Sequence, residues 1–395
     1  MEKNYLRKIR KSLISEFQKP QIVILTGMRQ VGKTTLLKDL FNLLPSENKI
    51  FIDLENPLNQ KIFEERNYEN ILLNFKSIGL KSEKNAFVFI DELQIMPQIV
   101  KPIKYLYDHY KIKFFLTGSS SFYLKGLFPE SLAGRKVIYE LFPLDFEEFL
   151  IFKNKEKKTY ESFEDKAKNK NMVDYEIFKG LYEEYLKFGG FPAVVLEEDF
   201  KRKELLLSDI FRSYFEKDVR TLADFRNISK FRDTILLLAG RCGSKLDISK
   251  MASELSISRE TLYSYINFLE KTYFISLISP YSKRINGEVR GAKKVYLCDT
   301  GMLNYLTKPS EGILFENAIY NYLKKLGKVN YYERYKGSEI DFILNSEIAF
   351  EVKISGSIYD LKKLKRVSEK LEIKKYFVIS KNFVELESTI IGYEL

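Results

Sequence analysis

The chain has 395 residues, 45% of them hydrophobic, which is enough for two or three folded domains with substantial cores. Its 65 lysines and arginines against 54 acidic residues give a net charge of +11, which suits either a polyanionic partner or a solvated lysine-rich surface. Two cysteines and one histidine exclude a disulfide framework and histidine-rich metal chemistry, and no apolar run reaches membrane-spanning length, so we expect a cytoplasmic protein without membrane contact.

The N-terminal part of the sequence contains its most specific motif. An amphipathic helix is predicted over residues 1–19, and an apolar run at residues 22–25 predicts a strand. Residues 27–34 then match the P-loop pattern G-x-x-x-x-G-K-[ST] without a mismatch. A chance strand, turn and helix is the alternative, but both flanking elements that the motif requires are predicted here.

Each fixed position of the motif has a physical role in holding a nucleotide triphosphate. Gly27 and Gly32 lack a Cβ, so the backbone can bend and turn its amides toward the phosphates. Lys33 adds a mobile cation, and the Thr34 hydroxyl can ligate Mg²⁺. The sequence therefore predicts a Mg-ATP site.

A second strong signal lies about sixty residues further on. After a strand predicted at 49–57, the apolar run 87–90 predicts a buried parallel strand that ends in Asp91 and Glu92. We expect Asp91 to hold Mg²⁺ and Glu92 to polarise the attacking water as general base, which makes this a Walker B segment. The residues expected to contact Mg-ATP are Gly27, Arg29, Gln30, Val31, Gly32, Lys33, Thr34, Thr35 and Asp91.

A further strand is predicted at 113–121, and a new apolar segment begins at 135. Together, the segments GMRQVGKTT, FVFIDELQ, LTGSSS, SLAGRKVIYELFPLDFEEFL and YLKFGGFPAVV resemble archaeal and bacterial AAA-type ATPases that carry a restriction-endonuclease-like C-terminal region. The resemblance spans almost the whole chain. It implies the sheet order of a P-loop ATPase with an additional strand, but it does not imply a substrate.

Two more site residues are suggested by this resemblance. In AAA-type ATPases a hydroxyl at the end of the strand beside Walker B acts as sensor 1, and Ser119 is the candidate, unless the Ser/Gly cluster only forms a turn. Arg135 is the candidate arginine finger, supplied in trans within a homo-oligomer, with an ordinary surface arginine as the alternative.

The middle of the chain divides into a polar segment, a helical segment and a helix-turn-helix pattern. Residues 151–230 are predicted to form a charged insertion and a helical lid, in which Gly189, Gly190 and Pro192 break helices. Arg212 and Arg220 are alternative sensor 2 residues. Residues 231–300 have the pattern of a winged helix, with helices from about 249 and from 259 to 271 and two wing strands. Basic residues are expected around the wing tip, namely Lys283, Arg284, Arg290, Lys293 and Lys294. DNA binding and a purely structural joint both remain open.

The C-terminal segment, residues 301–395, is predicted to run helix, three strands, helix, strand, which resembles the PD-(D/E)xK nuclease core. The residues that carry this resemblance are Glu316 on the first helix, Asp341, Glu351 and Lys353. Since alternate strand residues share a face, Glu351 and Lys353 should point the same way. With Asp341 they could hold a second Mg²⁺ against a phosphodiester. A solvated charged face or a docking module is the alternative.

The sequence thus predicts an α/β protein with a P-loop AAA-type ATPase core at 1–150, followed by a lid, a winged helix and a nuclease-like domain. We expect Mg-ATP hydrolysis coupled to nucleic-acid binding, DNA in particular. Two alternatives remain. One is a nucleotide-switched signalling or protein-docking module, and the other is an active ATP-regulated nuclease.

Overall fold

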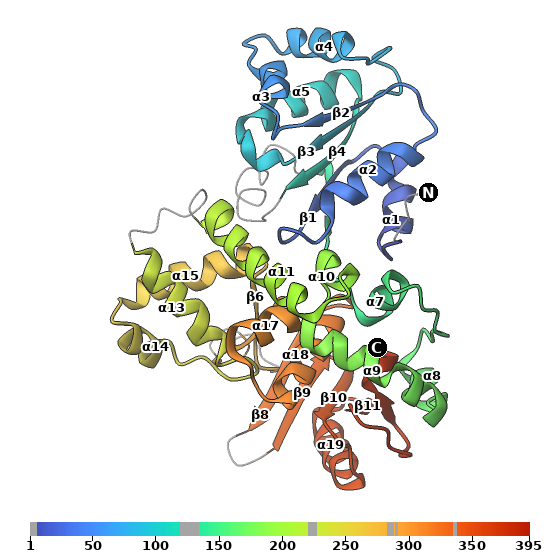
Figure 1. Cartoon of the computed structure of the whole chain (residues 1–395), viewed down its shortest axis with the longest axis vertical. Helices are drawn as coiled ribbons and strands as arrows, with labels where there is room; N and C mark the ends of the chain where they lie inside the picture. The colour runs from blue at the N-terminus through green and yellow to red at the C-terminus, as the bar shows by residue number, and fades with distance from the viewer. Residues whose placement is uncertain (1–5, 119–133, 220–226, 283–287, 289–290, 335–337) are drawn as a thin grey trace. The chain divides into compact units, whose positions relative to one another are not determined.

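A computed structural model describes residues 6–118, 134–219, 227–282, 288, 291–334 and 338–395. The chain forms two compact units (Figure 1). The first contains Met1–Phe142 and Lys271–Tyr273, and the second contains Pro143–Glu270 and Phe274–Leu395.

The first unit is built on a parallel five-stranded sheet with the order β2-β3-β4-β1-β5. Its strands are β1 (Ile22–Thr26), β2 (Lys49–Asp53), β3 (Phe87–Asp91), β4 (Lys113–Gly118) and β5 (Lys136–Glu140). Its helices are α1 (Arg10–Ser15), α2 (Lys33–Leu43), α3 (Pro57–Gln60), α4 (Tyr68–Ser77) and α5 (Val100–Tyr110). Strand β4 lies between β1 and β3, so the additional strand that the sequence led us to expect is present.

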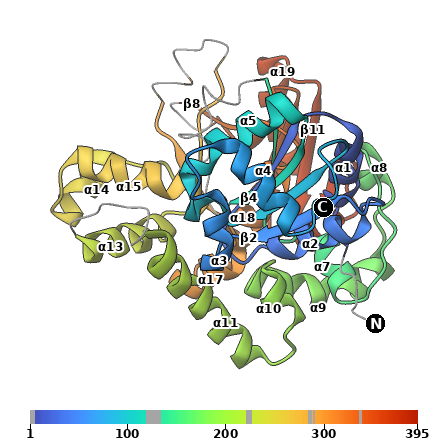
Figure 2. The same cartoon turned by 90° about the horizontal axis from the view of Figure 1, so that it is seen from above.

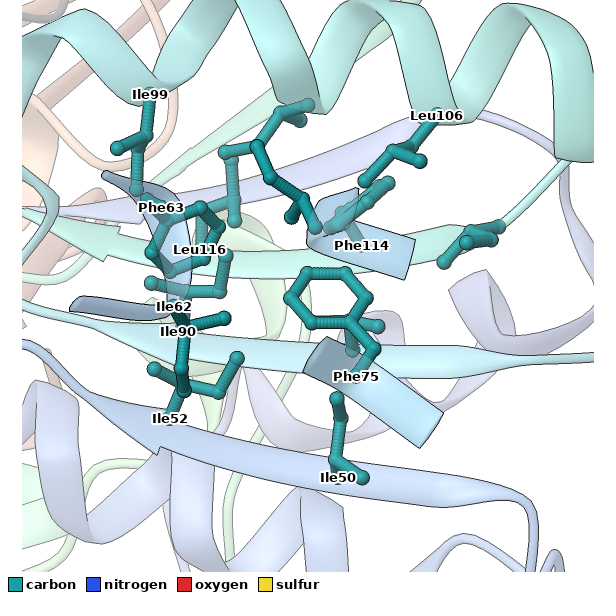
Figure 3. Close-up of a cluster of buried hydrophobic side chains, with 14 of the residues drawn as sticks. Ile50, Ile52, Ile62, Phe63, Phe75, Ile90, Ile99, Leu106, Phe114 and Leu116 are labelled. Atoms are coloured by element: carbon teal, nitrogen blue, oxygen red, sulfur yellow. The ribbon is translucent and has the colours of Figure 1, made fainter. Parts of the chain in front are cut away.

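Helices cover both faces of this sheet, which explains why its central strands are continuous apolar runs. On one face, alternate residues of the four strands β1 to β4 pack against α4, α5 and the turn before α4, and Figure 3 shows part of this cluster. The labelled members of this cluster are Ile50, Ile52, Ile62, Phe63, Phe75, Ile90, Ile99, Leu106, Phe114 and Leu116. On the other face, Phe41 of α2 meets Phe89 of β3 with ring centroids 5.3 Å apart. Burying each such side chain contributes about 1.5–3 kcal/mol to folding.

The second unit begins with helices. They are α7 (Phe146–Phe152), α8 (Phe163–Lys168), α9 (Met172–Phe188), α10 (Pro192–Leu196) and α11 (Phe200–Ser213). Helix α9 is followed by Gly189 at a φ of 76°, and Pro192 is the first residue of α10, so the predicted helix breaks are confirmed.

Three further helices and a hairpin follow in this unit. They are α13 (Ile228–Ala239), α14 (Ile248–Leu255), α15 (Arg259–Lys271), β6 (Ile275–Ile278) and β7 (Lys294–Leu297). The three helices lie side by side (Figure 2), and β6 pairs antiparallel with β7. The sequence predicts a tight turn at residues 256–258, and Ser256, at a φ of 53°, makes this turn between α14 and α15.

The rest of the second unit is a mixed sheet with the order β12-β11-β10-β9-β8. Its elements are α17 (Thr300–Thr307), α18 (Glu311–Leu323), β8 (Val329–Arg334), β9 (Ser338–Leu344), β10 (Ile348–Lys353), α19 (Ile358–Leu371), β11 (Lys375–Ser380) and β12 (Thr389–Ile391). The predicted order of helix, three strands, helix and strand is confirmed.

Two details of this sheet differ from the prediction. The sequence GILFENAIYNYLKKLG predicts a helix over residues 312–327 closed by Gly327. Helix α18 instead ends at Leu323, because residues 324–326 form a turn. The short edge strand β12 was not predicted, since three residues carry too little periodicity to be recognised.

Candidate functional site

The P-loop connects β1 to the N-terminus of α2. Gly32 takes the left-handed conformation at a φ of 95° immediately before the helix, and Gln30 has a φ of 62°. A Cβ on Gly27 would lie 2.1 Å from the carbonyl oxygen of Leu141, so only glycine fits there. These bends leave the first amides of α2 at the end of the loop, where a helix favours anionic ligands.

The lysine of the motif is buried, with only 5% of its surface exposed. The Lys33 ammonium donates hydrogen bonds to the carbonyl oxygens of Gly27 and Met28, at 2.9 and 2.8 Å. These bonds hold the ammonium inside the curve of the loop. A phosphate entering this curve would meet a cation that has already lost most of its hydration.

The other predicted P-loop residues differ in exposure. Gln30 and Thr35 are exposed, Arg29 and Thr34 are partly buried, and Val31 is fully buried. The Val31 carbonyl oxygen accepts a hydrogen bond of 2.8 Å from the guanidinium of Arg7, which fixes the loop from outside the motif.

The acidic pair lies at the end of β3, where Asp91 is 2% exposed. Its carboxylate accepts hydrogen bonds from the hydroxyls of Thr34, in the P-loop, and Thr117, in β4. Burial raises the pKa of Asp91, and these two hydrogen bonds oppose the rise. The structure therefore brings together two oxygen ligands predicted for Mg²⁺, and hard oxygen donors of this kind suit that ion.

Glu92 follows in a left-handed conformation, at a φ of 59°, which is unusual for a residue other than glycine. Its backbone amide donates a hydrogen bond of 3.0 Å to the Thr117 hydroxyl, and its carboxylate accepts one from the Gln94 side chain. Thr117 and Gln94 were not predicted as site residues. No local pattern in the sequence singles out Thr117, because its place beside Asp91 depends on the register of β3 and β4, in which Ile90 lies opposite Leu116.

The remaining predicted residues are placed as follows. Ser119 and Arg220 lie outside the described residues. Arg135 forms an ion pair with Asp108 of α5, with 2.7 Å between Nε and Oδ1, and its side chain is 37% exposed. Arg212 is exposed and lies 3.5 Å from Asp209, one turn earlier on the same helix.

A second group of charged side chains gathers on the C-terminal sheet. Glu351 is 2% exposed, and its Oε1 lies 2.8 Å from the Lys353 ammonium and 3.6 Å from that of Lys363. Asp341, on the adjacent strand, lies 4.0 Å from Lys353 and accepts a hydrogen bond of 2.7 Å from the Val352 amide. Glu351 and Lys353 thus share a face, as their spacing predicts.

Electrostatics in this cluster are dominated by burial. Burial, together with the charges of Glu351 and Glu316, raises the pKa of Asp341 to about 7. The buried Oε2 atom of Glu351 accepts no hydrogen bond from any described residue, so the cluster retains an acceptor without a partner. Across the described ranges, no three acidic, histidine or cysteine side chains are close enough together to form a metal cage by themselves.

One prediction about the wing tip is wrong. Lys294 was expected at an exposed wing tip, but it is only 5% exposed and its ammonium lies 2.8 Å from Glu339. Lys293 precedes β7 and is exposed, whereas Lys294 is the first residue of the strand and all four residues of the strand are buried. Lys283, Arg284 and Arg290 lie outside the described residues.

Comparison with known proteins agrees with the architecture of the first unit. Residues 19–150 match a family described as an AAA domain, and residues 179–311 match a domain of unknown function, DUF8612. The uncharacterized protein MJ1544 of Methanocaldococcus jannaschii is 30% identical over 340 residues, covering 83% of this chain and 73% of that protein. An uncharacterized protein of Haemophilus influenzae is 26% identical over 375 residues, covering 88% of this chain and 86% of that protein. Among solved structures, the Walker-type ATPase PABY2304 of Pyrococcus abyssi has a TM-score of 0.49 and 17% identity, over 76% of this chain and 95% of that one.

The match of residues 19–150 to an AAA domain and the geometry of the P-loop define a P-loop protein of the AAA type. The chain belongs to the family of MJ1544. Such a domain implies nucleotide binding. The likeness of residues 301–395 to restriction endonucleases stays a prediction. Among the described helices, none combines the length and apolar composition needed to cross a lipid bilayer.

Proposed function

We propose that the AAA domain binds and hydrolyses Mg-ATP. The observation that carries this proposal is the hydrogen bond between the Thr34 hydroxyl and the buried Asp91 carboxylate. It joins the P-loop to the acidic end of β3 and brings together two oxygen ligands for a metal ion. Thr34 and Asp91 fit a magnesium ion because both are hard oxygen ligands.

Each residue would have a distinct task in the reaction. Lys33 and the P-loop amides would hold the β- and γ-phosphates, and Glu92 would accept a proton from the attacking water. Bound Mg²⁺ would neutralise the negative charge that develops on the phosphates. Lys33 would have to leave the carbonyls of Gly27 and Met28 to reach a phosphate, so the loop exchanges internal hydrogen bonds for bonds to its ligand.

The test is nucleotide binding and turnover by Lys33→Ala, with Lys38→Ala on the exposed side of the same helix as control. We expect Lys33→Ala to lower ATP turnover about 100-fold or more, because the charge-assisted phosphate contact is lost. Lys38→Ala should keep normal turnover. Calorimetry would measure binding and phosphate release would measure turnover, and full activity in Lys33→Ala would refute the assignment of the pocket.

We further propose that hydrolysis is coupled to nucleic-acid binding, DNA in particular, by the second unit. Support comes from the three helices and hairpin formed by α13–α15, β6 and β7, and from the net charge of +11. A nucleotide-switched module that docks another protein is the alternative. If the protein contacts DNA phosphates, the logarithm of its affinity for duplex DNA should fall linearly with the logarithm of the salt concentration. Docking of another protein need not show this dependence.

A second candidate function is metal-dependent cleavage of a phosphodiester at the C-terminal cluster. The specific observation is the buried Oε2 atom of Glu351, which lacks a hydrogen-bond donor among the described residues and lies on the carboxylate that faces Lys353. Asp341 and Glu351 would hold the metal, with Glu316 nearby, and Lys353 would position water. Asp341→Ala and Lys353→Ala should each abolish cleavage of labelled DNA and leave ATP hydrolysis unchanged.

A further inference from the structure

Strand β7 pairs with β6 in the hairpin, but two of its side chains contact the acidic cluster of the C-terminal sheet. Lys294 lies 2.8 Å from Glu339 of β9, and the Tyr296 hydroxyl donates a hydrogen bond of 2.7 Å to Glu316 of α18. Lys294 is 5% exposed and Tyr296 is fully buried. Since residues two apart in a strand share a face, β7 presents both side chains to this cluster together.

The cluster has an excess of acid. Its carboxylates are Glu316, Glu339, Asp341 and Glu351, and its ammonium groups are Lys294, Lys353 and Lys363. With every group ionised, four carboxylates against three lysines leave one negative charge without a matching positive one. Unmatched negative charge in a largely buried place is costly unless a cation binds there. A divalent cation would change the net charge of the cluster from −1 to +1. The single negative charge of one nucleic-acid phosphate would then bring it to zero.

We propose that Lys294 and Tyr296 of β7 are positioning residues of the C-terminal metal site. Tyr296 holds the Glu316 carboxylate in place, and the Lys294 ammonium is the resident counter-charge with which a divalent cation competes. The inference rests on the proposed metal site at Asp341 and Glu351, and it adds the hairpin to that site. Metal binding at the sheet and nucleic-acid binding at the hairpin are then linked, each altering the affinity for the other.

A purely structural role for these two residues makes a different prediction. If they only packed the interior, replacing either one would loosen the site and weaken metal binding. As positioning residues they act in opposite directions. Loss of the Lys294 charge removes a competitor and strengthens cation binding, whereas loss of the Tyr296 hydroxyl releases Glu316 and weakens it.

The experiment is a titration of the nucleotide-free full chain with Mn²⁺ alone, followed by calorimetry, with Asp341→Asn as the baseline. Lys294→Met should bind Mn²⁺ about tenfold more tightly, and Tyr296→Phe should bind about tenfold more weakly. Lys294→Arg keeps the positive charge and should bind Mn²⁺ with the wild-type affinity. The matched control is Lys293→Ala, the exposed residue immediately before β7, which should change affinity less than twofold.

Each outcome separates the inference from the function on which it rests. Equal Mn²⁺ binding by wild type and Asp341→Asn would remove the metal site and this inference with it. Clear binding by wild type, with Lys294→Met equal to it or weaker, would overturn the inference and leave the metal site standing. Lys294→Gln repeats the test with a polar side chain that also lacks the charge. For every variant, unchanged ATP hydrolysis and an unchanged thermal unfolding temperature confirm that the protein is folded.

Discussion

Thr117 is the residue that ties the two acids at the end of β3 to the neighbouring strand. Its hydroxyl donates to Asp91 and accepts a hydrogen bond from the Glu92 amide, and it is completely buried. One side chain therefore fixes both the ligand predicted for magnesium and the backbone of the predicted general base. The left-handed conformation of Glu92 is maintained in part by this contact.

We expect Thr117→Val to lower the turnover of ATP about 10- to 100-fold with little change in nucleotide affinity. Valine has nearly the same shape but leaves the Glu92 amide without this acceptor and removes one of the two hydroxyls that donate to Asp91. Thr117→Ser keeps the hydroxyl and should retain most of the activity. Steady-state kinetics would separate the two effects, and equal activity of the valine and serine variants would contradict the assigned role.

At this scale the sequence predicted what a contiguous motif encodes. The P-loop and the acidic pair are local patterns, so their residues were found directly. Thr117 was missed in favour of Ser119 because the choice depends on how two strands 26 residues apart are aligned. Gln94 was missed because its role depends on the left-handed turn at Glu92, which no local pattern announced.

Among the elements, the junction of α9, α10 and α17 depends on three glycines. A Cβ on Gly190 would lie 2.1 Å from the Leu144 carbonyl oxygen, and one on Gly301 would lie 2.0 Å from that of Phe188. A Cβ on Gly189 would lie 2.0 Å from the carboxylate of Asp299, which caps α17 and accepts a hydrogen bond of 2.7 Å from the Gly190 amide. The segment YLKFGGFPAVV, which contributes to the family resemblance, therefore serves in packing, because its two glycines allow this close approach.

Gly190→Ala should destabilise the protein by about 2–4 kcal/mol, since the clash is with backbone that cannot move aside. Gly180→Ala is the matched control, because it lies on the exposed side of α9 with nothing within 4 Å of a new Cβ. That control should be neutral or stabilising by up to about 1 kcal/mol through helix propensity. Urea unfolding would measure both, and equal stabilities would show that the junction adapts.

Asp299 adds a dependence on pH to the same junction. Burial raises its pKa from 3.8 to about 6, against the hydrogen bonds from the Gly190 and Met302 amides. A group whose pKa is raised on folding adds stability below its unfolded pKa and loses it as pH rises through the folded value. Comparing wild type with Asp299→Asn, the difference in unfolding free energy should change by about 1 kcal/mol between pH 5 and pH 7.5. A difference that does not vary over this range would argue against a raised pKa.

Element types were predictable from periodicity, whereas side-chain placement often was not. Helices α14 and α15 carry the 3.6-residue apolar pattern, and the residues between them have the composition of a tight turn. The sequence therefore predicted all three elements. Lys294 was misplaced because a pair of lysines suggests solvent, whereas the strand that begins at Lys294 is buried over its whole length. Strand β12 escaped notice because pairing with β11, rather than its own sequence, defines it.

At the scale of the whole molecule, the proposed arginine finger requires a second copy of the chain. Arg135 is paired with Asp108 in the same chain, so acting in trans would require that ion pair to break. Because the pair is partly exposed, it contributes at most about 1 kcal/mol, and breaking it is feasible.

Mixing two inactive variants tests this arrangement. Lys33→Ala lacks a working P-loop and Arg135→Ala lacks the finger, so a mixed oligomer contains some sites with both groups intact. We expect the equimolar mixture to recover about a quarter of the wild-type phosphate release if the oligomer is a dimer and exchange is complete. If crosslinking demonstrates mixed assemblies but the mixture recovers no phosphate release, Arg135 does not act on the site of a neighbouring chain.

The central position of β4 constrains how related sequences can diverge. Because β4 is hydrogen-bonded to β1 on one side and β3 on the other, a slip by a single residue would turn every side chain over and set Leu116 or Gly118 beside the acids. The outer strands β2 and β5 each have a single neighbour in this sheet. Insertions and deletions in distant lineages should therefore accumulate around the outer strands and spare the interval between the acidic pair and Thr117.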